Sequence, residues 1–200
     1  MARCHRSDEA ATTTSSPPGH PQRRRLFVGC EGESEQAYVA LLARLADDAR
    51  LAVHLDAVLL QPGGGDPLAI VELAAQRADE REGRRGEPYA RRFVLLDDDK
   101  LGQAPQRDQR IAGVAAAAGL HLVWQKPCHE AVLLRHLEGC SQFQPPTTAV
   151  AGQQLVQRWA NYEKAMPSAR LAERLDHAAI VRVSAVEAEL AAFLQDLGLI

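Results

Sequence analysis

The chain has 200 residues, with 23 Lys or Arg, 26 Asp or Glu and a net charge of −3 at pH 7. Its four cysteines form no CxxC pair, which disfavours a zinc site or a disulfide framework and indicates reduced thiols in a cytoplasmic protein. No apolar run of eighteen residues is present, and residues 1–20 lack the apolar core of a signal peptide, so neither a membrane span nor a secretory leader is expected.

The charges are distributed unevenly along the chain. Residues 1–25 carry five arginines and two acids, whereas the rest carries 18 basic and 24 acidic residues. An acidic body is unlike a stand-alone nonspecific DNA-binding protein, which presents a basic face to the phosphates. Binding of a nucleic acid would therefore require a local basic patch or a partner.

Strand and helix patterns alternate after a polar start. Residues 1–24 are predicted to be a flexible tail, because the stretch from Thr12 to Pro18 is small and polar and buries little apolar surface. Helices are then predicted from about residues 34, 67, 107 and 129, the second after a glycine turn with Asp66 as its N-cap. The predicted strands are 26–30, 53–61, 92–96 and 121–125.

This alternation predicts β-α-β units with right-handed crossovers. The expected fold is an α/β domain over residues 25–144, with a mostly parallel four-stranded sheet flanked by helices. Residues 145–200 show helical patterns alone and are predicted to pack on this domain. The helices expected there are 153–164, 168–177 and 184–197, the last with Ser184 and Glu187 at capping-box spacing.

Acidic residues follow two of the predicted strands. Glu31 comes directly after the first strand, and Asp97 and Asp99 come after the third. Ligands gather at the carboxyl ends of parallel strands, and side chains two residues apart share a face if the strand continues. Two such carboxylates repel each other and attract Mg²⁺ or Mn²⁺, which prefer oxygen ligands. Glu31 is expected to be a further metal ligand or a general acid or base.

The acidic residues also have simpler explanations. Acids after a strand are often solvated loop residues or helix N-caps, and the triplet at 97–99 alone does not decide between these roles and a metal site. Asp98 points the other way and is expected to be solvated or capping. Glu33 and Glu35 are explained as first-turn acids that complement a helix dipole. The glycine turn lacks the Lys-Ser/Thr of a P-loop, which disfavours an NTPase.

Three motifs in order resemble the RloB-like family, which is related to Toprim-fold proteins and OLD-type nucleases. The motifs are Leu26-Phe-Val-Gly-Cys-Glu-Gly-Glu33, Leu96-Asp-Asp-Asp99 and Pro127-Cys-His-Glu130, the last followed by leucines and His136. The resemblance covers about residues 26–140, and Tyr162-x-Lys164 resembles a further element of the family. It implies a Toprim-like fold in which Glu31 is the Toprim glutamate and Asp97 and Asp99 are the acidic pair.

The same resemblance implies a Mg²⁺- or Mn²⁺-dependent nuclease. Glu31, Asp97 and Asp99 would hold the metal, and Glu130 and Lys164 would join them as catalytic residues. Members of the family occur beside ABC- or OLD-type ATPases in bacterial anti-phage and restriction-associated loci. This implies an effector with a nucleic-acid substrate and an ATPase partner, and it leaves a homo-oligomer open.

Two other functions remain open from the sequence. A non-catalytic regulatory subunit that binds an ABC- or OLD-type ATPase is favoured by the acidic body, whereas the acidic residues at 31, 97 and 99 favour the nuclease. A phosphatase acting on a small phosphorylated ligand is a third hypothesis. Glu130 is equally a first-turn acid of its helix, and the helical spacing of His136 among Val132, Leu133 and Leu137 favours a packing role.

Overall fold

The computed structural model describes residues 23–60 and 65–200. The predicted tail at residues 1–22 and the turn residues 61–64 lie outside this range. The strands are β1 (Arg24–Cys30), β2 (Val53–Leu59), β3 (Arg91–Asp97) and β4 (Leu120–Gln125). The helices are α1 (Glu33–Asp48), α2 (Pro67–Arg85), α3 (Pro105–Ala117), α4 (His129–His136), α5 (Thr148–Arg158), α6 (Ser168–Leu171), α7 (His177–Ser184) and α8 (Ala188–Leu197).

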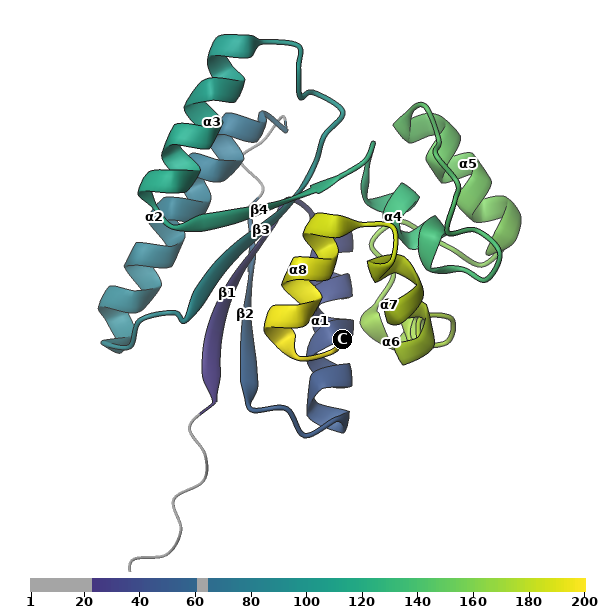
Figure 1. Cartoon of the computed structure of the whole chain (residues 1–200), viewed down its shortest axis with the longest axis horizontal. Coiled ribbons are helices and arrows are strands. Elements are labelled where there is room, and N and C mark those ends of the chain that lie inside the picture. Colours follow the sequence, from purple (N-terminus) through teal and green to yellow (C-terminus); the bar gives the residue numbers. More distant parts are fainter. Residues whose placement is uncertain (1–22, 61–64) are drawn as a thin grey trace, which may run out of the picture.

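The four strands form one parallel sheet in the order β2-β1-β3-β4. This confirms the predicted α/β class and parallel sheet. Parallel neighbours need a crossover connection, and a helix follows each of the first three strands for this reason. Helices α2 and α3 cover one face, while α1 and α8 cover the other, and α4 to α7 form a helical group beside them (Figure 1).

Side chains alternate along the strands between two apolar cores, as the period of two requires. In β3, Phe93 and Leu95 belong to the larger core, which contains residues of α1 and α4 to α8. Val94 and Leu96 belong to the smaller core under α2 and α3. The C-terminal helices therefore share one core with the sheet. None of the helices in the described ranges combines the length and the apolar character needed to span a bilayer.

Several predicted boundaries are wrong. Arg24, assigned to the tail, is the first residue of β1. The helix predicted at 153–164 is α5, which starts at Thr148 and ends at Arg158. The helix predicted at 184–197 is interrupted, because Ser184 ends α7 and its hydroxyl donates to the carbonyl of Val181 at 2.9 Å instead of capping α8. Asp176 caps α7 by accepting from the N–H of Ala179 at 2.8 Å, and the segment predicted as 168–177 keeps helical form only over α6.

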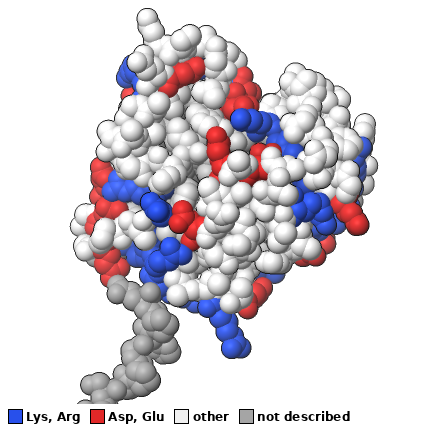
Figure 2. Space-filling view, viewed as in Figure 1, with Lys and Arg blue, Asp and Glu red and all other residues white. Residues whose placement is uncertain are grey.

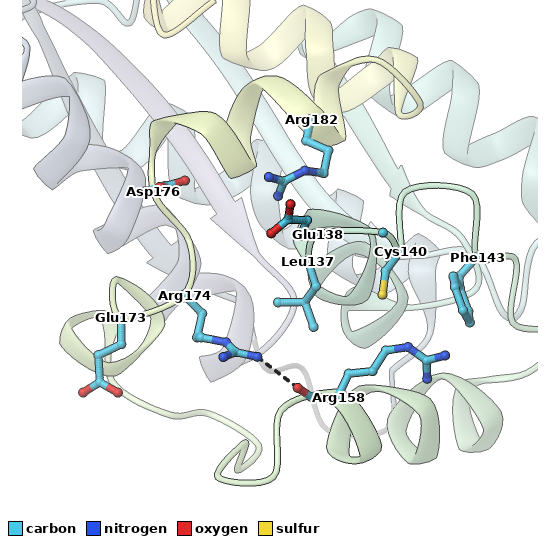
Figure 3. Close-up of a pocket in the computed structure, with 10 residues that line it drawn as sticks. Leu137, Glu138, Cys140, Phe143, Arg158, Glu173, Arg174, Asp176 and Arg182 are labelled. Atoms are coloured by element: carbon cyan, nitrogen blue, oxygen red, sulfur yellow. Dashed lines mark hydrogen bonds between the residues drawn. The ribbon is translucent and has the colours of Figure 1, made fainter.

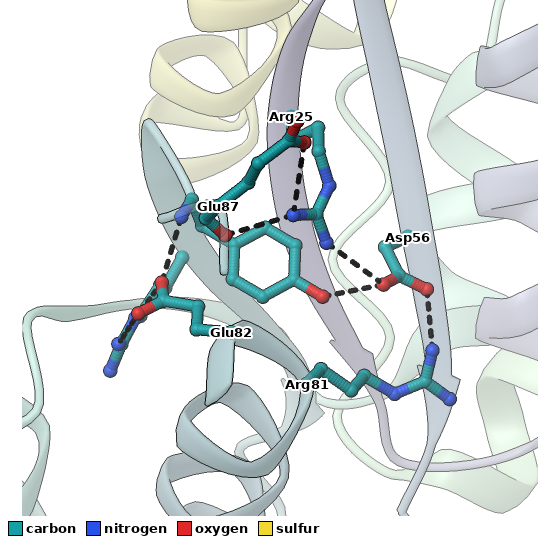
Figure 4. A network of polar contacts seen from close by, with 7 residues as sticks. Arg25, Asp56, Arg81, Glu82 and Glu87 are labelled. Atoms are coloured by element: carbon teal, nitrogen blue, oxygen red, sulfur yellow. Dashed lines mark hydrogen bonds and ion pairs between the residues drawn. The ribbon is translucent and has the colours of Figure 1, made fainter. Parts of the chain in front are cut away.

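A buried polar network joins β1, β2 and α2 (Figure 4). Asp56 is 9% exposed and accepts hydrogen bonds from Arg81 Nη1 at 2.7 Å and Tyr89 Oη at 2.5 Å. Arg25 Nη2 lies 3.8 Å from the same carboxylate, and its guanidinium lies 4.5 Å above the centre of the Tyr89 ring. Burial and the hydrogen bond to Asp56 raise the pKa of Tyr89 to about 12, so its phenol stays a donor. Asp56 is therefore the shared acceptor of the network.

Asp56→Asn is expected to lower the free energy of unfolding by about 2 kcal/mol, since an amide cannot replace a charged acceptor shared by several donors. Urea unfolding followed by circular dichroism measures the change. Glu87→Gln is the control, because the Glu87 side chain is 56% exposed and lies 3.7 Å from Arg25, so its loss should cost less than about 0.5 kcal/mol. Equal losses in the two variants would contradict the central role of Asp56.

Candidate active site

The carboxyl ends of β1 and β3 bring Glu31 and Asp97 together. The strands are neighbours in register, with Cys30 opposite Leu95, so both ends meet at one edge of the sheet. Glu31 Oε2 accepts a hydrogen bond from the backbone N–H of Asp97 at 2.9 Å. Asp97 Oδ1 in turn accepts from the N–H of His129, the first residue of α4, at 2.9 Å. Two hydrogen bonds thus connect β1, β3 and the positive end of the α4 dipole.

An acidic cavity of about 420 Å³ lies over these residues. Five acidic residues line it, namely Glu31, Glu33 and Glu35 of α1, Asp97 and Glu130 of α4, and among them Glu33 is exposed. Lys164, in the segment after α5, also lines the cavity, and its Nζ lies 4.0 Å from Glu130 Oε1. The structure therefore gathers four of the residues singled out in the sequence, Glu31, Asp97, Glu130 and Lys164, at one place.

Asp99 lies apart from this group. The same-face argument required β3 to continue to Asp99, but the strand ends at Asp97 and the chain turns, with the N–H of Leu101 bonded to the carbonyl of Asp98 at 2.9 Å. Asp99 is exposed and is not part of the cavity lining. Its charge nevertheless raises the pKa of Glu31, so it lies within electrostatic range of the site.

Two lining residues with buried ionisable side chains, Glu35 and His129, were not assigned to the site from the sequence. Glu35 does cap α1, because its Oε2 accepts from the N–H of Gly32 at 3.0 Å, yet it is 5% exposed and also lines the cavity. The three-residue spacing of Gly32 and Glu35 signals the cap, but not the second role. His129 was given no role of its own from the sequence, because no local pattern marks it as part of the site.

The imidazole of His129 supplies a buried donor beside the acids. His129 is 2% exposed, and Gln125 Nε2 lies 2.8 Å from its Nδ1. Because the amide donates to Nδ1, the proton of the neutral ring resides on Nε2. That Nε2 has no hydrogen-bond partner in the described part of the chain. A buried donor without an acceptor is costly, and no residue in the described ranges offsets this cost.

Burial and like charges perturb the acids strongly. Burial, together with the charges of Glu35, Glu31 and Glu130, raises the pKa of Asp97 to about 9, against the opposing hydrogen bond from His129. Burial also raises the pKa of Glu31, although the N–H of Asp97 works in the other direction. In the absence of a cation Asp97 is therefore protonated at neutral pH. Without a compensating positive charge, the cavity therefore disfavours the ionised forms of Asp97 and Glu31.

The donors at this site fit a hard divalent cation. Carboxylate oxygens are the ligands that Mg²⁺ and Mn²⁺ prefer, and a cation relieves the repulsion that raises these pKa values. Across residues 23–60 and 65–200, no three Asp, Glu, His or Cys side chains are already grouped as a complete ligand set. The site is thus an acidic cavity with suitable donors and not a closed coordination cage.

Another cavity, of about 570 Å³, lies in the helical group (Figure 3). Its charged lining is balanced, with three arginines and three carboxylates, namely Arg158, Arg174, Arg182, Glu138, Glu173 and Asp176. No excess of one charge calls for a counter-ion there. On the face shown in Figure 2, acidic and basic side chains are interspersed without a continuous basic surface. The acidic cavity is therefore the better candidate for metal-dependent chemistry.

His136 lies outside the acidic cavity and is fully buried. Its Nδ1 lies 2.8 Å from the carbonyl of Val132 and must donate to it, which leaves Nε2 to accept from Tyr38 Oη at 3.0 Å. Burial lowers the pKa of His136 to about 3, and the charges of His129, Arg182 and Arg135 act in the same direction. His136 is thus a neutral residue that joins α4 to α1, the packing role that its spacing favoured.

This lowered pKa predicts a loss of stability in acid. Between about pH 6.5 and pH 3 the unfolded chain binds a proton on His136 that the folded protein does not, so the free energy of unfolding falls as the pH falls. The contribution is complete above about pH 6.5 and decreases by at most about 1.4 kcal/mol per pH unit below it. His136→Gln keeps an amide near Tyr38 but cannot titrate. Urea unfolding at about pH 7.5 and about pH 5 should show the advantage of wild type over this variant shrinking, and a constant difference would contradict the assignment.

A comparison with protein-family models finds one description that fits this chain. Residues 26–191 match the family described as RloB-like protein. No curated protein and no solved structure gives a significant match. The matched range runs from β1 into α8 and contains every residue that lines the acidic cavity. The chain belongs to the RloB-like protein family.

Proposed function

We propose that this protein is a nuclease that hydrolyses phosphodiester bonds of DNA or RNA with the help of a divalent cation. The observation that carries the proposal is the convergence of Glu31, Glu35, Asp97 and Glu130 on one cavity at the carboxyl ends of parallel strands. A phosphate is an anion and would be repelled by these groups alone. A cation that attracts both the acids and the phosphate gives this arrangement a function.

Glu31 and Asp97 are the residues that would hold the cation. Each gives one carboxylate oxygen to a backbone N–H, which fixes the orientation of the carboxylate and leaves its second oxygen for the ion. We include Asp99 as an outer carboxylate, since its charge already acts on Glu31. A bound Mg²⁺ or Mn²⁺ would neutralise charge that develops on the reacting phosphate.

The other lining residues act on the substrate and its protons. Lys164 is 80% exposed at its side chain and would contact a phosphate at the edge of the cavity. Glu130, 8% exposed on the first turn of α4, is assigned to proton transfer. His129 orients Asp97 through its backbone N–H, and Glu35 keeps the local charge high enough to favour a cation.

We further propose a wider role on the basis of family membership. In this role the protein has a Toprim-like fold related to OLD-type nucleases and is the cytoplasmic effector of a bacterial anti-phage or restriction-associated system. An ABC- or OLD-type ATPase would control it. The acidic body supports the need for such a partner, because 24 acids against 18 bases in residues 26–200 do little to attract a polyanion.

The test combines metal binding with hydrolysis. A cation at about 100 times its dissociation constant should stabilise the fold by about 2.7 kcal/mol, which is about 5–10 °C in Tm. Labelled DNA and RNA should be cut in Mg²⁺ or Mn²⁺, alone or with the neighbouring ATPase, and cutting should stop in excess chelator. If no cation raises the Tm and no substrate is cut with the ATPase present, the non-catalytic regulatory subunit becomes the better assignment.

A further inference from the structure

A groove on the outward face of α5 continues from the acidic cavity. Its volume is about 590 Å³, within the usual range for small-molecule sites. Glu130 and Lys164 line both the groove and the acidic cavity, so the two spaces share one boundary. Beyond these two residues the groove is lined by uncharged side chains, including Val156 and Tyr162.

The groove is open because one face of α5 is uncovered. Ala149, Gly152, Gln153 and Val156 are three, four and seven residues apart and therefore share a helix face. Val156 is 46% exposed, unusual for a large apolar side chain in this fold. A Cβ added at Gly152 would meet no heavy atom within 4 Å. Space for a flat ligand thus lies directly above the helix backbone.

We propose that this groove binds the base of an unpaired nucleotide whose phosphate lies in the acidic cavity. The inference rests on the proposed nuclease function and names its substrate class, single-stranded nucleic acid. An apolar surface with a tyrosine ring suits the face of a base, and the amides of Gln153 and Gln157 suit the donors and acceptors of its edge. In a duplex the same faces and edges are already stacked and paired, so a base must leave the helix to enter.

The charges favour a single strand as well. Duplex binding relies on many Lys and Arg contacts to phosphates, whereas the lining of this groove contains one cation, Lys164, beside Glu130. Lys164 stands at the junction, where the phosphate attached to the bound base would pass. Stacking of one base contributes about 5- to 150-fold in affinity and needs no basic surface. The acidic body therefore weakens the binding of a duplex, which depends on phosphate contacts, more than it weakens the binding of a single strand, which is held partly by its bases.

Gly152→Leu tests the groove with the full-length protein. The leucine side chain would extend into the groove from a position whose Cβ meets no heavy atom within 4 Å, and leucine favours the helix over glycine. Binding is measured by fluorescence anisotropy with labelled oligo(dT), oligo(U) and an oligo(dA)·oligo(dT) duplex, in Ca²⁺ to slow hydrolysis. We expect single strands to bind the wild type best and to bind Gly152→Leu about tenfold or more weakly. Cleavage of the same probes is measured in Mn²⁺.

Gly113→Leu is the matched control, because Gly113 is also a helical glycine with open space, on α3 at the other face of the sheet. It should bind and cut like the wild type. Val156→Asp, at an exposed position of the groove, repeats the test if Gly152→Leu lowers the Tm. A preference for oligo(U) or for oligo(dT) shows whether the unpaired nucleotide comes from RNA or DNA.

The outcomes separate the groove from the nuclease. Single-strand binding that Gly152→Leu weakens and Gly113→Leu does not supports the groove even if nothing is cut, in which case the nuclease proposal falls alone. Metal-dependent cutting that Gly152→Leu leaves unchanged overturns the groove and leaves the nuclease. Duplex that binds as tightly as single strand, or no binding of any probe, also overturns the groove.

Discussion

Asp97→Asn should lower phosphodiester hydrolysis by at least about 100-fold and remove the stabilisation by Mg²⁺ or Mn²⁺. Loss of a group that merely supports a metal ligand commonly costs 10- to 100-fold, and loss of a proposed ligand should cost no less. The amide keeps the size of the carboxylate and can still accept from the N–H of His129. The metal-free variant should be as stable as the wild type or slightly more stable, since Asp97 must take up a proton to become neutral in the folded protein at neutral pH, whereas the amide is already neutral. Cleavage rates and Tm with and without cation measure both effects.

Asp98→Asn is the control for this experiment. Asp98 is the next residue in the chain, but it does not line the acidic cavity, and the charges that act on it include those of Lys126, Glu189 and Arg135. Its substitution should leave hydrolysis and metal-dependent stabilisation within about twofold of wild type. Similar losses in Asp97→Asn and Asp98→Asn would mean that a generally acidic loop, and not an organised site, binds the cation.

Arg135→Ala should destabilise the protein by about 3–5 kcal/mol, the usual cost of breaking a buried ion pair from one side. Arg135 is fully buried in α4 and forms an ion pair with Glu187. It also donates to the carbonyls of Lys126 at 2.6 Å and Phe143 at 3.1 Å. Its loss leaves a largely buried carboxylate and two carbonyls without their donor. For a chain of this size the Tm should fall by about 6–20 °C.

Arg110→Ala provides the comparison, because Arg110 is 67% exposed and its ion pair with Glu72 at 3.1 Å lies at the surface. An exposed pair of this kind contributes less than about 1 kcal/mol. If the two variants have the same Tm, the buried contacts of Arg135 contribute no more to the free energy of unfolding than an exposed ion pair does. The result also concerns the acidic cavity. Arg135 donates to the carbonyl of Lys126, which lies three residues before His129, the residue whose N–H contacts Asp97.

Local patterns in the sequence were enough to predict the framework of the site. Continuous apolar runs at Leu26–Cys30 and before Asp97 mark strands covered on both faces. Alternation with helices makes such strands parallel, and parallel strands end at the same edge. The positions of Glu31 and Asp97 beside each other follow from these rules, because both are properties of short segments and their order.

The same patterns failed where a chain turn or a helix boundary decides the outcome. The alternation expected for Asp99 ended with β3 at Asp97. Ser184, predicted to cap the last helix, is instead the last residue of α7, where its hydroxyl donates to the carbonyl of Val181. Each of these boundaries depends on a single local hydrogen bond. Other hydrogen bonds are equally reasonable at these positions, and hydrophobic periodicity does not show which of them forms.

Tertiary packing alone decided what surrounds the two acids. Glu35 and His129 lie in segments whose local patterns are those of ordinary helix starts, and they become site residues because α1 and α4 close on the same strand ends. Lys164 reaches the cavity from a segment distant in sequence. The raised pKa of Asp97 has the same origin, since its largest cause is burial, which is set by how separate segments pack together. The sequence determined which groups could do chemistry, and packing determined how they are charged and which of them meet.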